Sequence, residues 1–419
     1  MGIFDKMLTE SCKREFFERK SLRLSTDEKY LCQLSEYLFS NECDNDVRRL
    51  KSGDYFFDAP TFHLVRKNHS TERRKVFAFE GKSKLILQFM TFMLMELDDT
   101  LPDSLCSFRR GDRTKMFFNK VRRLDRGRTH YVMKTDVHDY GGSIDQDMAI
   151  ELVERMIPND PEFMAFFKWI MTRNEFYRQG KLVCERVSII EGFPIGSFVA
   201  SVFLTELDRL LESQADIYMR YNDDIAFFTD SYEKALWALE QTRDICAKKG
   251  LSLNERKTTI VSPGEPTELL GIEILDGDFD IGENSLQKQF SKLKRFRDKL
   301  LRGVRYGKIT KAQAFQRMVR FTDRIFYGVK IGDHEFNWVM HAFPMITRTD
   351  GLERLDKYAQ DCIRVAGTGK LGNAKYRIRY KDMCEAGYRS LVHAYYHGST
   401  IEELTTNEAA AHNADTIIG

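Results

Sequence analysis

The chain has 419 residues, which is too long for one small binding module, and its hydrophobic fraction of 42% can bury a sizeable core. Charged residues make up 31% and prolines number only 8, so a wholly disordered chain is excluded. The formal net charge of +2 does not point to a polyanionic partner. The eight cysteines lie too far apart for a C-x-x-C zinc pair, so we expect reduced thiols and a cytoplasmic location.

The first hundred residues predict helices and no membrane association. Residues 1–50 mix acids and bases among scattered apolar positions, which is typical of solvated amphipathic helices. Leu85–Met95 is the most apolar run, but it is far shorter than the roughly 20 residues that span a bilayer, so it predicts a buried helix. Lys6 stands where a myristoylation motif needs Ser or Thr, and no targeting segment is expected.

Two stretches concentrate positive charge although the whole chain is nearly neutral. Leu101–Thr135 holds ten basic and three acidic residues, and Leu286–Lys330 holds fourteen basic and two acidic ones. In the second stretch apolar residues recur every three or four positions, which predicts two amphipathic helices with cationic outer faces. Such faces bind polyanions, and a merely solvated charged face is the alternative.

Between the basic stretches, short β-like runs are separated by turn signals, which predicts a small sheet covered by helices. The predicted strands are Tyr131–Thr135, Ile217–Tyr221, Ile225–Thr229, Thr258–Val261 and Leu269–Ile274. Ser143 and Gln146 have the spacing of a capping box ahead of a helix over Met148–Met156.

Three aspartates are the main candidates for chemistry. Asp136 ends one predicted strand, and the turn residues Asn222 and Asp223 predict a hairpin with Asp223 and Asp224 at its tip. Adjacent carboxylates repel unless a cation neutralises them. Together the three could hold two Mg²⁺ ions, or Mn²⁺ in their place, roughly 3.5 to 4 Å apart, as in phosphoryl transfer. For the hairpin taken alone, an ordinary solvated turn is the alternative.

The ordered set of motifs resembles the palm of reverse transcriptases. Three segments carry the resemblance, and they are Thr135–Val137, Gly192–Ser201 and Tyr221–Asp224. The resemblance implies that the three aspartates bind metal and that the carbonyl of Val137 faces it. It also implies a close approach of backbone to substrate at Gly196, beneath the templating base pair.

Further segments extend the resemblance to about residues 107–327. Gly250–Thr258 resembles the next motif of the family, which implies that Lys257 protonates the leaving pyrophosphate. Glu268–Ile272 is similar to the primer-grip hairpin, and it precedes the cationic helices where the family has its thumb.

The resemblance also implies nucleotide contacts. Ser107–Gly111 looks like the fingers element whose basic side chains, here Arg109 and Arg110, hold the triphosphate. Relatives place a bulky aromatic residue five positions after the first aspartate to exclude a ribose 2′-hydroxyl. That position is Gly141 here, so either Tyr140 takes the role or ribonucleotides are admitted.

The implied fold is α+β, a right-hand polymerase with fingers, a palm sheet, a helical thumb and a helical C-terminal region. The expected ranges are 1–130 for N-terminal helices and fingers, 131–278 for the palm with a fingers insertion at about 145–185, 279–345 for the thumb and 346–419 for the C-terminal region and tail.

The implied function is RNA-directed DNA synthesis from dNTPs. The chain is similar to stand-alone bacterial reverse transcriptases, which include retron and diversity-generating enzymes and a defence-associated, abortive-infection-like group that acts against phage. That group implies a structured noncoding RNA as template, and a partner protein or a second copy of the chain. The alternatives are a template-independent or ribonucleotide-adding polymerase, a catalytically silent RNA-binding palm protein and a nucleotidyl cyclase.

Overall fold

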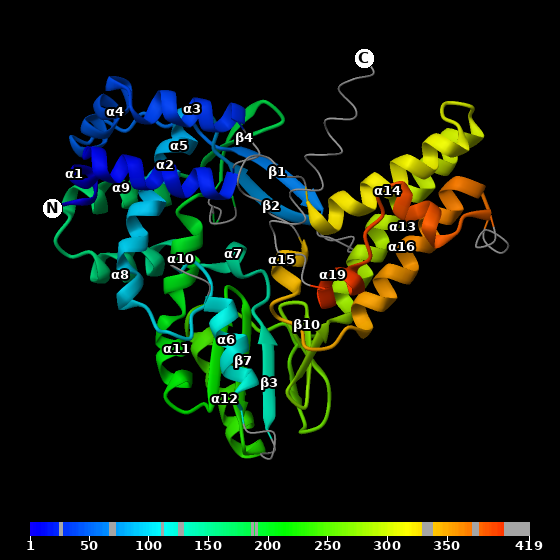
Figure 1. Ribbon diagram of the computed structural model, residues 1–419. Helices are drawn as coiled ribbons and strands as arrows, with labels where there is room; N and C mark the ends of the chain where they lie inside the picture. The colour runs from blue at the N-terminus through cyan, green and yellow to red at the C-terminus, as the bar shows by residue number, and fades with distance from the viewer. Residues whose placement is uncertain are drawn as a thin grey trace. The chain divides into compact units, whose positions relative to one another are not determined.

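A computed structural model describes residues 1–24, 28–66, 73–109, 113–124, 130–185, 188, 192–328, 338–370 and 377–397. The chain divides into two compact units, Met1–Glu265 and Pro266–Gly419. Helices and sheets both contribute to each unit (Figure 1), so the predicted α+β class is confirmed. Among the described residues, every helix is too short or too polar to cross a membrane.

The first unit contains most of the elements. Its helices are α1 (Ile3–Met7), α2 (Glu10–Leu24), α3 (Glu28–Leu38), α4 (Asn41–Lys51), α5 (Gly81–Leu94), the 3-10 helix η1 (Met95–Thr100), α6 (Arg113–Arg122), α7 (Tyr140–Ser143), α8 (Gln146–Met156), α9 (Pro161–Thr172), α10 (Gly196–Phe203), α11 (Thr205–Glu212) and α12 (Tyr232–Lys248). Its strands are β1 (Thr61–Arg66), β2 (Arg73–Ala78), β3 (Tyr131–Asp136), β4 (Glu175–Arg178), β5 (Lys181–Cys184), β6 (Ile217–Tyr221), β7 (Asp224–Thr229) and β8 (Thr259–Val261).

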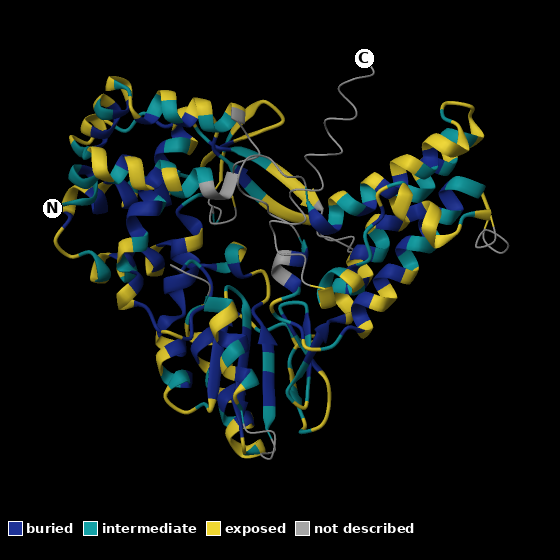
Figure 2. Ribbon diagram, in the orientation of Figure 1, coloured by how far each residue is buried: buried dark blue, intermediate teal, exposed yellow. Residues whose placement is uncertain are grey.

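The first unit contains a four-stranded sheet, the central sheet, with the order β6-β7-β3-β8. β6 and β7 are nearly continuous apolar runs, which is typical of strands covered on both faces, and Figure 2 shows them as buried. Helix α12 packs against β3 and β7, and α11 packs against β6. The four strands predicted in this region are therefore confirmed, with ends shifted by at most one residue.

A second sheet of the first unit joins segments that are far apart in the sequence. Its order is β2-β1-β4-β5, with β1 antiparallel to β2 and parallel to β4. The rings of Phe62, Phe77 and Phe176 meet on one face with centroids 5.3 to 5.8 Å apart, which ties the β1–β2 hairpin to β4. The sequence patterns did not predict this sheet.

Helix α5 supplies much of the core of the first unit. Eight of its fourteen residues are buried, so the buried helix predicted at Leu85–Met95 is confirmed. Phe16 of α2 stacks on Phe89 of α5 with ring centroids 4.9 Å apart. The amphipathic helices predicted within residues 1–50 are present as α1 to α4.

The second unit combines a small sheet with long helices. Its elements are β9 (Thr267–Leu269), β10 (Ile272–Leu275), β11 (Asp278–Ile281), α13 (Glu283–Arg305), α14 (Lys311–Tyr327), α15 (Trp338–Ala342), α16 (Asp350–Thr368), α18 (Tyr380–Glu385) and α19 (Leu391–His397). The stacked rings of Phe296 and Phe321, 3.9 Å apart, join α13 to α14. The two predicted amphipathic helices are thus confirmed as α13 and α14.

Two local predictions were wrong. Leu269–Ile274 is not one strand, because Leu270 and Gly271 adopt positive φ angles of 50° and 84° and form the turn between β9 and β10. Helix α8 is capped by Asp145, whose side chain accepts from the Met148 N–H at 2.9 Å, and not by the predicted Ser143 box. In both places the local signal was correct in kind and misplaced by a few residues.

Candidate active site

The pairing of β3 with β7 brings the three predicted aspartates together. Their antiparallel register places Asp136 opposite Asp224, and the Val137 N–H donates to the Asp223 carbonyl at 3.1 Å. Asp223 lies in the two-residue turn between β6 and β7, where Asn222 has a φ of 55°. The predicted hairpin is therefore confirmed, and all three carboxylates belong to one edge of the central sheet.

The segment before β8 holds Asp136 from the other side. The Asn254 N–H donates to the Asp136 backbone carbonyl at 2.8 Å, and its side-chain amide donates to Oδ1 of the same residue at 3.2 Å. The Lys257 ammonium donates to Oδ2 of Asp136 at 2.6 Å. Asp136 is thereby fixed by both its backbone and its carboxylate.

The electrostatics of this cluster leave negative charge in excess. Burial, followed by the charges of Asp223 and Asp136, raises the pKa of Asp224 to about 6. Burial and then Asp136 also raise the pKa of Asp223. Partial burial opposes the charge of Lys257, but its hydrogen bond to Asp136 and the three carboxylates outweigh this and raise its pKa. The positive charges of Lys257, Arg74 and Lys134 oppose these rises in pKa but do not cancel them.

The donor set fits a hard divalent cation without forming a finished cage. Within the described ranges, no group of three or more His, Cys, Asp or Glu side chains is arranged so that it could hold a metal ion. Mg²⁺ does not require such a cage, because it keeps several waters and binds through one or two carboxylates and substrate phosphates. The repulsion that raises the pKa of Asp224 is the kind that a bound cation relieves. Asp136, Asp223 and Asp224 are thus the residues that would hold it.

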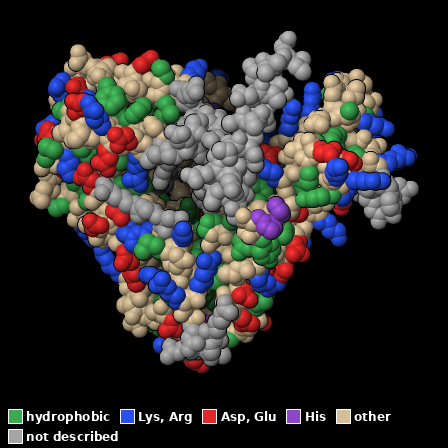
Figure 3. All heavy atoms as spheres, in the orientation of Figure 1, with side chains coloured by type: hydrophobic (Ala, Val, Ile, Leu, Met, Phe, Trp, Pro, Cys, Tyr) green, Lys and Arg blue, Asp and Glu red, His purple; other side chains and the backbone are tan. Residues whose placement is uncertain are grey.

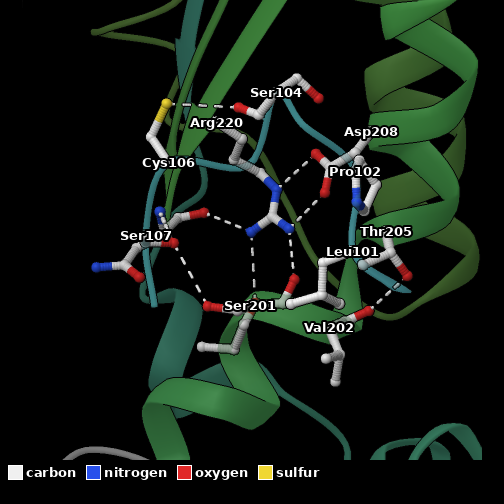
Figure 4. A network of polar contacts seen from close by, with 12 residues as sticks. Leu101, Pro102, Ser104, Cys106, Ser107, Ser201, Val202, Thr205, Asp208 and Arg220 are labelled. Carbon is white, nitrogen blue, oxygen red and sulfur yellow. Dashed lines mark hydrogen bonds and ion pairs between the residues drawn. The ribbon is translucent and has the colours of Figure 1, made fainter. Parts of the chain in front are cut away.

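A buried polar network supports the hairpin that carries Asp223 (Figure 4). The guanidinium of Arg220 in β6 donates to both carboxylate oxygens of Asp208 in α11, at 2.8 and 2.6 Å. It also donates to the carbonyl of Asn222 at 3.0 Å and to that of Ser201, at the end of α10, at 2.6 Å. Arg220 and Asp208 have no exposed surface.

The remaining predicted residues lie directly after β3, in α7 and at the start of α10. Val137 is buried directly after β3, and Gly196 is the first residue of α10. Tyr140 is 5% exposed, and its hydroxyl donates to the Ala200 carbonyl at 2.6 Å. The carbonyl of Gly141 accepts from the Ser188 hydroxyl at 2.7 Å.

The predicted role of Arg109 in triphosphate binding was wrong. Its guanidinium is buried, donates to Asp98 at 2.6 Å and also bonds the carbonyl of Pro102, so it stabilises the loop between η1 and α6. An arginine that is 5% exposed and bonded in this way has no face left for a nucleotide. Arg110 lies outside the described residues.

Three residues of the site were not singled out from the sequence. Asn254 lies inside the motif Gly250–Thr258 and Arg220 directly before the motif Tyr221–Asp224, but position in a motif does not show which partners a residue will meet. Arg74 lies in β2, and its charge opposes the rise in the pKa of Asp223 that burial and Asp136 cause. Residues 73–78 are three basic residues followed by three apolar ones, so no alternating pattern marks this strand in the sequence.

Known proteins similar to this chain include enzymes that copy nucleic acid. Retron Ec86 reverse transcriptase from Escherichia coli is 26% identical over 117 residues, which cover 27% of this chain. The match spans 37% of that protein, little more than a third of its length.

Two solved structures are similar at low sequence identity. Apo telomerase from Candida tropicalis matches with 10% identity and a TM-score of 0.44, over 79% of this chain and 60% of that chain. Telomerase from Candida albicans in complex with a TWJ fragment of telomeric RNA matches with 12% identity and a TM-score of 0.43, over 84% and 68%.

A family model described as "Reverse transcriptase (RNA-dependent DNA polymerase)" matches residues 65–274, which are half of the chain. The matched range contains β2, the central sheet and all three clustered aspartates. The resemblance seen in the sequence motifs is confirmed, and the chain belongs to the reverse transcriptase family.

Proposed function

We propose that the protein is an RNA-directed DNA polymerase that extends a primer with dNTPs along an RNA template. The register of β3 and β7 carries this proposal, because it sets Asp136 opposite Asp224 beside Asp223 and leaves their charge unbalanced. Bound divalent cations, Mg²⁺ or Mn²⁺, supply the positive charge that polarises the attacking hydroxyl and the leaving pyrophosphate. We propose two such ions.

The protein's own residues orient the reactants and move one proton. The primer 3′ oxygen forms a bond to the α-phosphorus of the dNTP, the bond from that phosphorus to pyrophosphate breaks, and the hydroxyl proton goes to solvent. Lys257 is protonated at neutral pH, since its carboxylate neighbours raise its pKa, and it can donate a proton to the pyrophosphate. Asn254 and Lys257 hold Asp136 in place before substrate binds.

Arg74 replaces Arg109 as the proposed triphosphate ligand. It lies on β2, and its charge acts on Asp223, whereas Arg109 is enclosed by Asp98 and loop carbonyls. A guanidinium near the carboxylates can bind phosphate oxygens through paired hydrogen bonds. The basic contact therefore comes from the β1–β2 hairpin.

Tyr140 is the proposed sugar-selecting residue, in the absence of a side chain at Gly141. Its hydroxyl is bonded to the Ala200 carbonyl, so contact with a sugar would use the ring. Strict use of dNTPs by the wild type, together with lost discrimination in Tyr140→Ala, is the expected primer-extension result. Equal use of rNTPs by the wild type would support the ribonucleotide-adding alternative.

Helix α13 presents a stripe of cations suited to a nucleic-acid backbone. The stripe consists of Lys288, Lys292, Arg295, Lys299 and Arg302, spaced by three and four residues and all exposed. In the described part of the chain none of the five pairs with a carboxylate, and burial with the nearby charges of Arg295 and Lys288 lowers the pKa of Lys292. Blue Lys and Arg side chains are numerous over this helical unit in Figure 3. We propose that the stripe binds phosphates without sequence preference, so binding weakens with salt.

We propose that the chain is divided into fingers, palm, thumb and a C-terminal region, as the resemblance to the family implies. Residues 1–130 and the insertion at about 145–185 form the fingers, 131–278 the palm, 279–345 the thumb and 346–419 a C-terminal region. The pairing of β1 with β4 supports the interleaving, because it joins residues 61–66 to the insertion.

Primer extension on a defined RNA template tests the proposed function. Wild-type protein with Mg²⁺ and dNTPs should give DNA whose sequence complements the template, and EDTA should abolish it. Product that forms without template, or contains ribonucleotides, would favour the alternative polymerases. Binding of RNA without any synthesis would favour a silent RNA-binding protein.

We also propose that the enzyme acts in the bacterial cytoplasm in defence against phage, with a structured noncoding RNA, a partner protein or a second copy of the chain. The resemblance carries this proposal, and the eight free cysteines agree with a reducing compartment. Plaque counts on cells that express wild type or Asp223→Asn test it. Equal counts would contradict a defence role, and sequencing of co-purified nucleic acid would identify the template.

A further inference from the structure

The strongest unexplained feature near the site is the buried guanidinium of Arg220. Five of its contacts lie between 2.6 and 3.4 Å, and they join β6 to α11, to the end of α10 and to the turn after β6. Burial opposes its charge, but the ion pair with Asp208 outweighs this and raises its pKa, so it stays charged. Figure 4 shows the guanidinium in the middle of these groups.

The network fixes the residue that precedes Asp223 on both of its sides. The carbonyl of Asn222 accepts from Arg220 at 3.0 Å, and its N–H donates to the Ser107 hydroxyl at 3.1 Å. These two groups belong to the two peptide planes that flank Asn222. Asn adopts a left-handed φ, here 55°, more readily than most residues other than glycine, and the two hydrogen bonds hold Asn222 in this conformation. The orientation of Asp223 thus depends on these bonds.

The same guanidinium also reaches the residue proposed to select the sugar. The carbonyl of Ala200 accepts from Tyr140 at 2.6 Å and lies 3.4 Å from a guanidinium nitrogen of Arg220. Tyr140 and Asn222 are therefore linked through one buried guanidinium, Tyr140 by way of the Ala200 carbonyl and Asn222 directly. The two residues are not neighbours in the sequence.

We propose that Arg220 is a positioning residue that sets the geometry of the metal-binding carboxylates through the backbone of Asn222. The inference rests on the proposed function and adds a residue to its machinery. Arg220 does not touch substrate or metal. It holds the turn so that Asp223 faces Asp136 and Asp224 before any cation binds.

The test must separate positioning from simple stabilisation. Arg220→Met alone would leave Asp208 charged and unpaired in the core, and loss of folding would explain nothing. The double variant Arg220→Met with Asp208→Asn removes both charges and keeps an acceptor for the Tyr218 hydroxyl, which lies 2.9 Å from Asp208. Arg220→Lys is the second variant, since it keeps the charge but has one nitrogen where the network uses three.

Three measurements on folded protein decide the matter: the melting temperature, Mn²⁺ affinity by electron paramagnetic resonance, and the kcat and KM for dNTP. For the double variant we expect a melting temperature near the wild-type value, Mn²⁺ binding weaker by about tenfold and a kcat lower by roughly 10- to 100-fold with KM almost unchanged. Arg220→Lys should shift the same quantities in the same direction. If either variant folds and keeps wild-type Mn²⁺ affinity and kcat, the inference is wrong.

The failure of this inference can be told apart from failure of the proposed function. Absence of primer extension by the wild type would overturn the polymerase, while Mn²⁺ binding would still rank the variants. Asp223→Asn serves as the reference, because it removes a metal ligand and leaves the Arg220 network whole. Mn²⁺ binding that falls for Asp223→Asn but not for the Arg220 variants would refute positioning and leave the polymerase standing.

Discussion

Two charged clusters share the β6–β7 hairpin, which contributes Arg220 to one and Asp223 and Asp224 to the other, and they are built on opposite principles. In the cluster of Arg220 and Asp208 every charge is buried and matched, with bonds to both carboxylate oxygens. In the cluster of Asp136, Asp223 and Asp224 the charges repel, and the pKa of Asp224 rises to about 6.

The contrast shows how the geometry of the repelling carboxylates is maintained. The carboxylate cluster cannot hold itself together, since its members gain by moving apart. The compensated cluster next to it, joined through Asn222, provides the rigidity. Substitutions should therefore behave differently in the two places. In the carboxylate cluster they should lower activity and spare stability, whereas a substitution that removes only one partner of the compensated cluster should lower both.

The largest expected effect is on catalysis in Asp223→Asn. Loss of one carboxylate should lower kcat for primer extension by about a thousandfold or more, because charge at the reacting phosphate is no longer balanced. The melting temperature should not fall, since a repelling charge is removed. Asp230→Asn is the matched control, an exposed aspartate at the end of β7 whose lysine contact is 3.7 Å long. Activity in Asp223→Asn near that of this control would contradict the assigned role.

A smaller loss of activity is expected for Lys257→Ala. Removal of the ammonium takes away the proposed proton donor and frees Asp136, so kcat should fall by roughly 100-fold. Lys234→Ala removes an exposed lysine of α12 and should have no effect. The pH profile of kcat is the discriminating measurement, because the limb at high pH should disappear in Lys257→Ala. A profile that keeps this limb would assign the proton donor elsewhere.

Substitution of Gly192 tests how tightly the segment before α10 is docked on β2. Its φ is +89°, and an added Cβ would lie 2.8 Å from the Phe77 carbonyl oxygen and 2.6 Å from Val76. Gly180 has a φ of +76° with nothing within 4 Å, so Gly180→Ala reports backbone strain alone. We expect unfolding free energies lower by about 1 kcal/mol for Gly180→Ala and by roughly 3 kcal/mol for Gly192→Ala in urea titrations. Equal losses would show that the close approach does not matter.

The smallest effect concerns the stability of the metal-free protein. Because the pKa of Asp224 is raised from 3.8 to about 6, folding binds a proton there, and this stabilising contribution is full below about pH 4 and is lost as the pH rises through 6. In EDTA at pH 8, Asp224→Asn should therefore raise the melting temperature by a few degrees, and at pH 5 by less. Addition of Mg²⁺ should raise the wild type more than the variant. The same difference at both pH values would contradict the repulsion.

Much of this architecture could be predicted because its signals are local. The strands of the central sheet, the Asn222 and Asp223 turn and helices α13 and α14 follow from alternation, turn residues and helical spacing. The three aspartates were found because strand ends and a tight turn leave few places for their side chains. The three aspartates come together because β3 pairs with β7 in a register that sets Asp136 opposite Asp224. The resemblance carried by the order of the motifs implied that they would meet.

The errors came from contacts that no local pattern encodes. The β2-β1-β4-β5 sheet depends on a pairing across more than a hundred residues. Arg109 lies inside a motif and Arg220 directly before one, and their burial against Asp98 and Asp208 is a property of the folded chain. Arg74 was missed because its role depends on where the β1–β2 hairpin is placed.

The position of β3 has a consequence for how the chain reaches its native state. This strand is made early, yet its two neighbours are β7, about ninety residues later, and β8, more than a hundred and twenty residues later. During synthesis the backbone amides and carbonyls of β3 are unpaired on both sides of the strand until β7 and β8 have been made. Unpaired strands promote aggregation, and pairing over such long sequence separations is slow. A chain that ends before Val261 cannot complete its central sheet. Binding of chaperones to the nascent chain should therefore be greatest after β3 has been made and before β8 has been made.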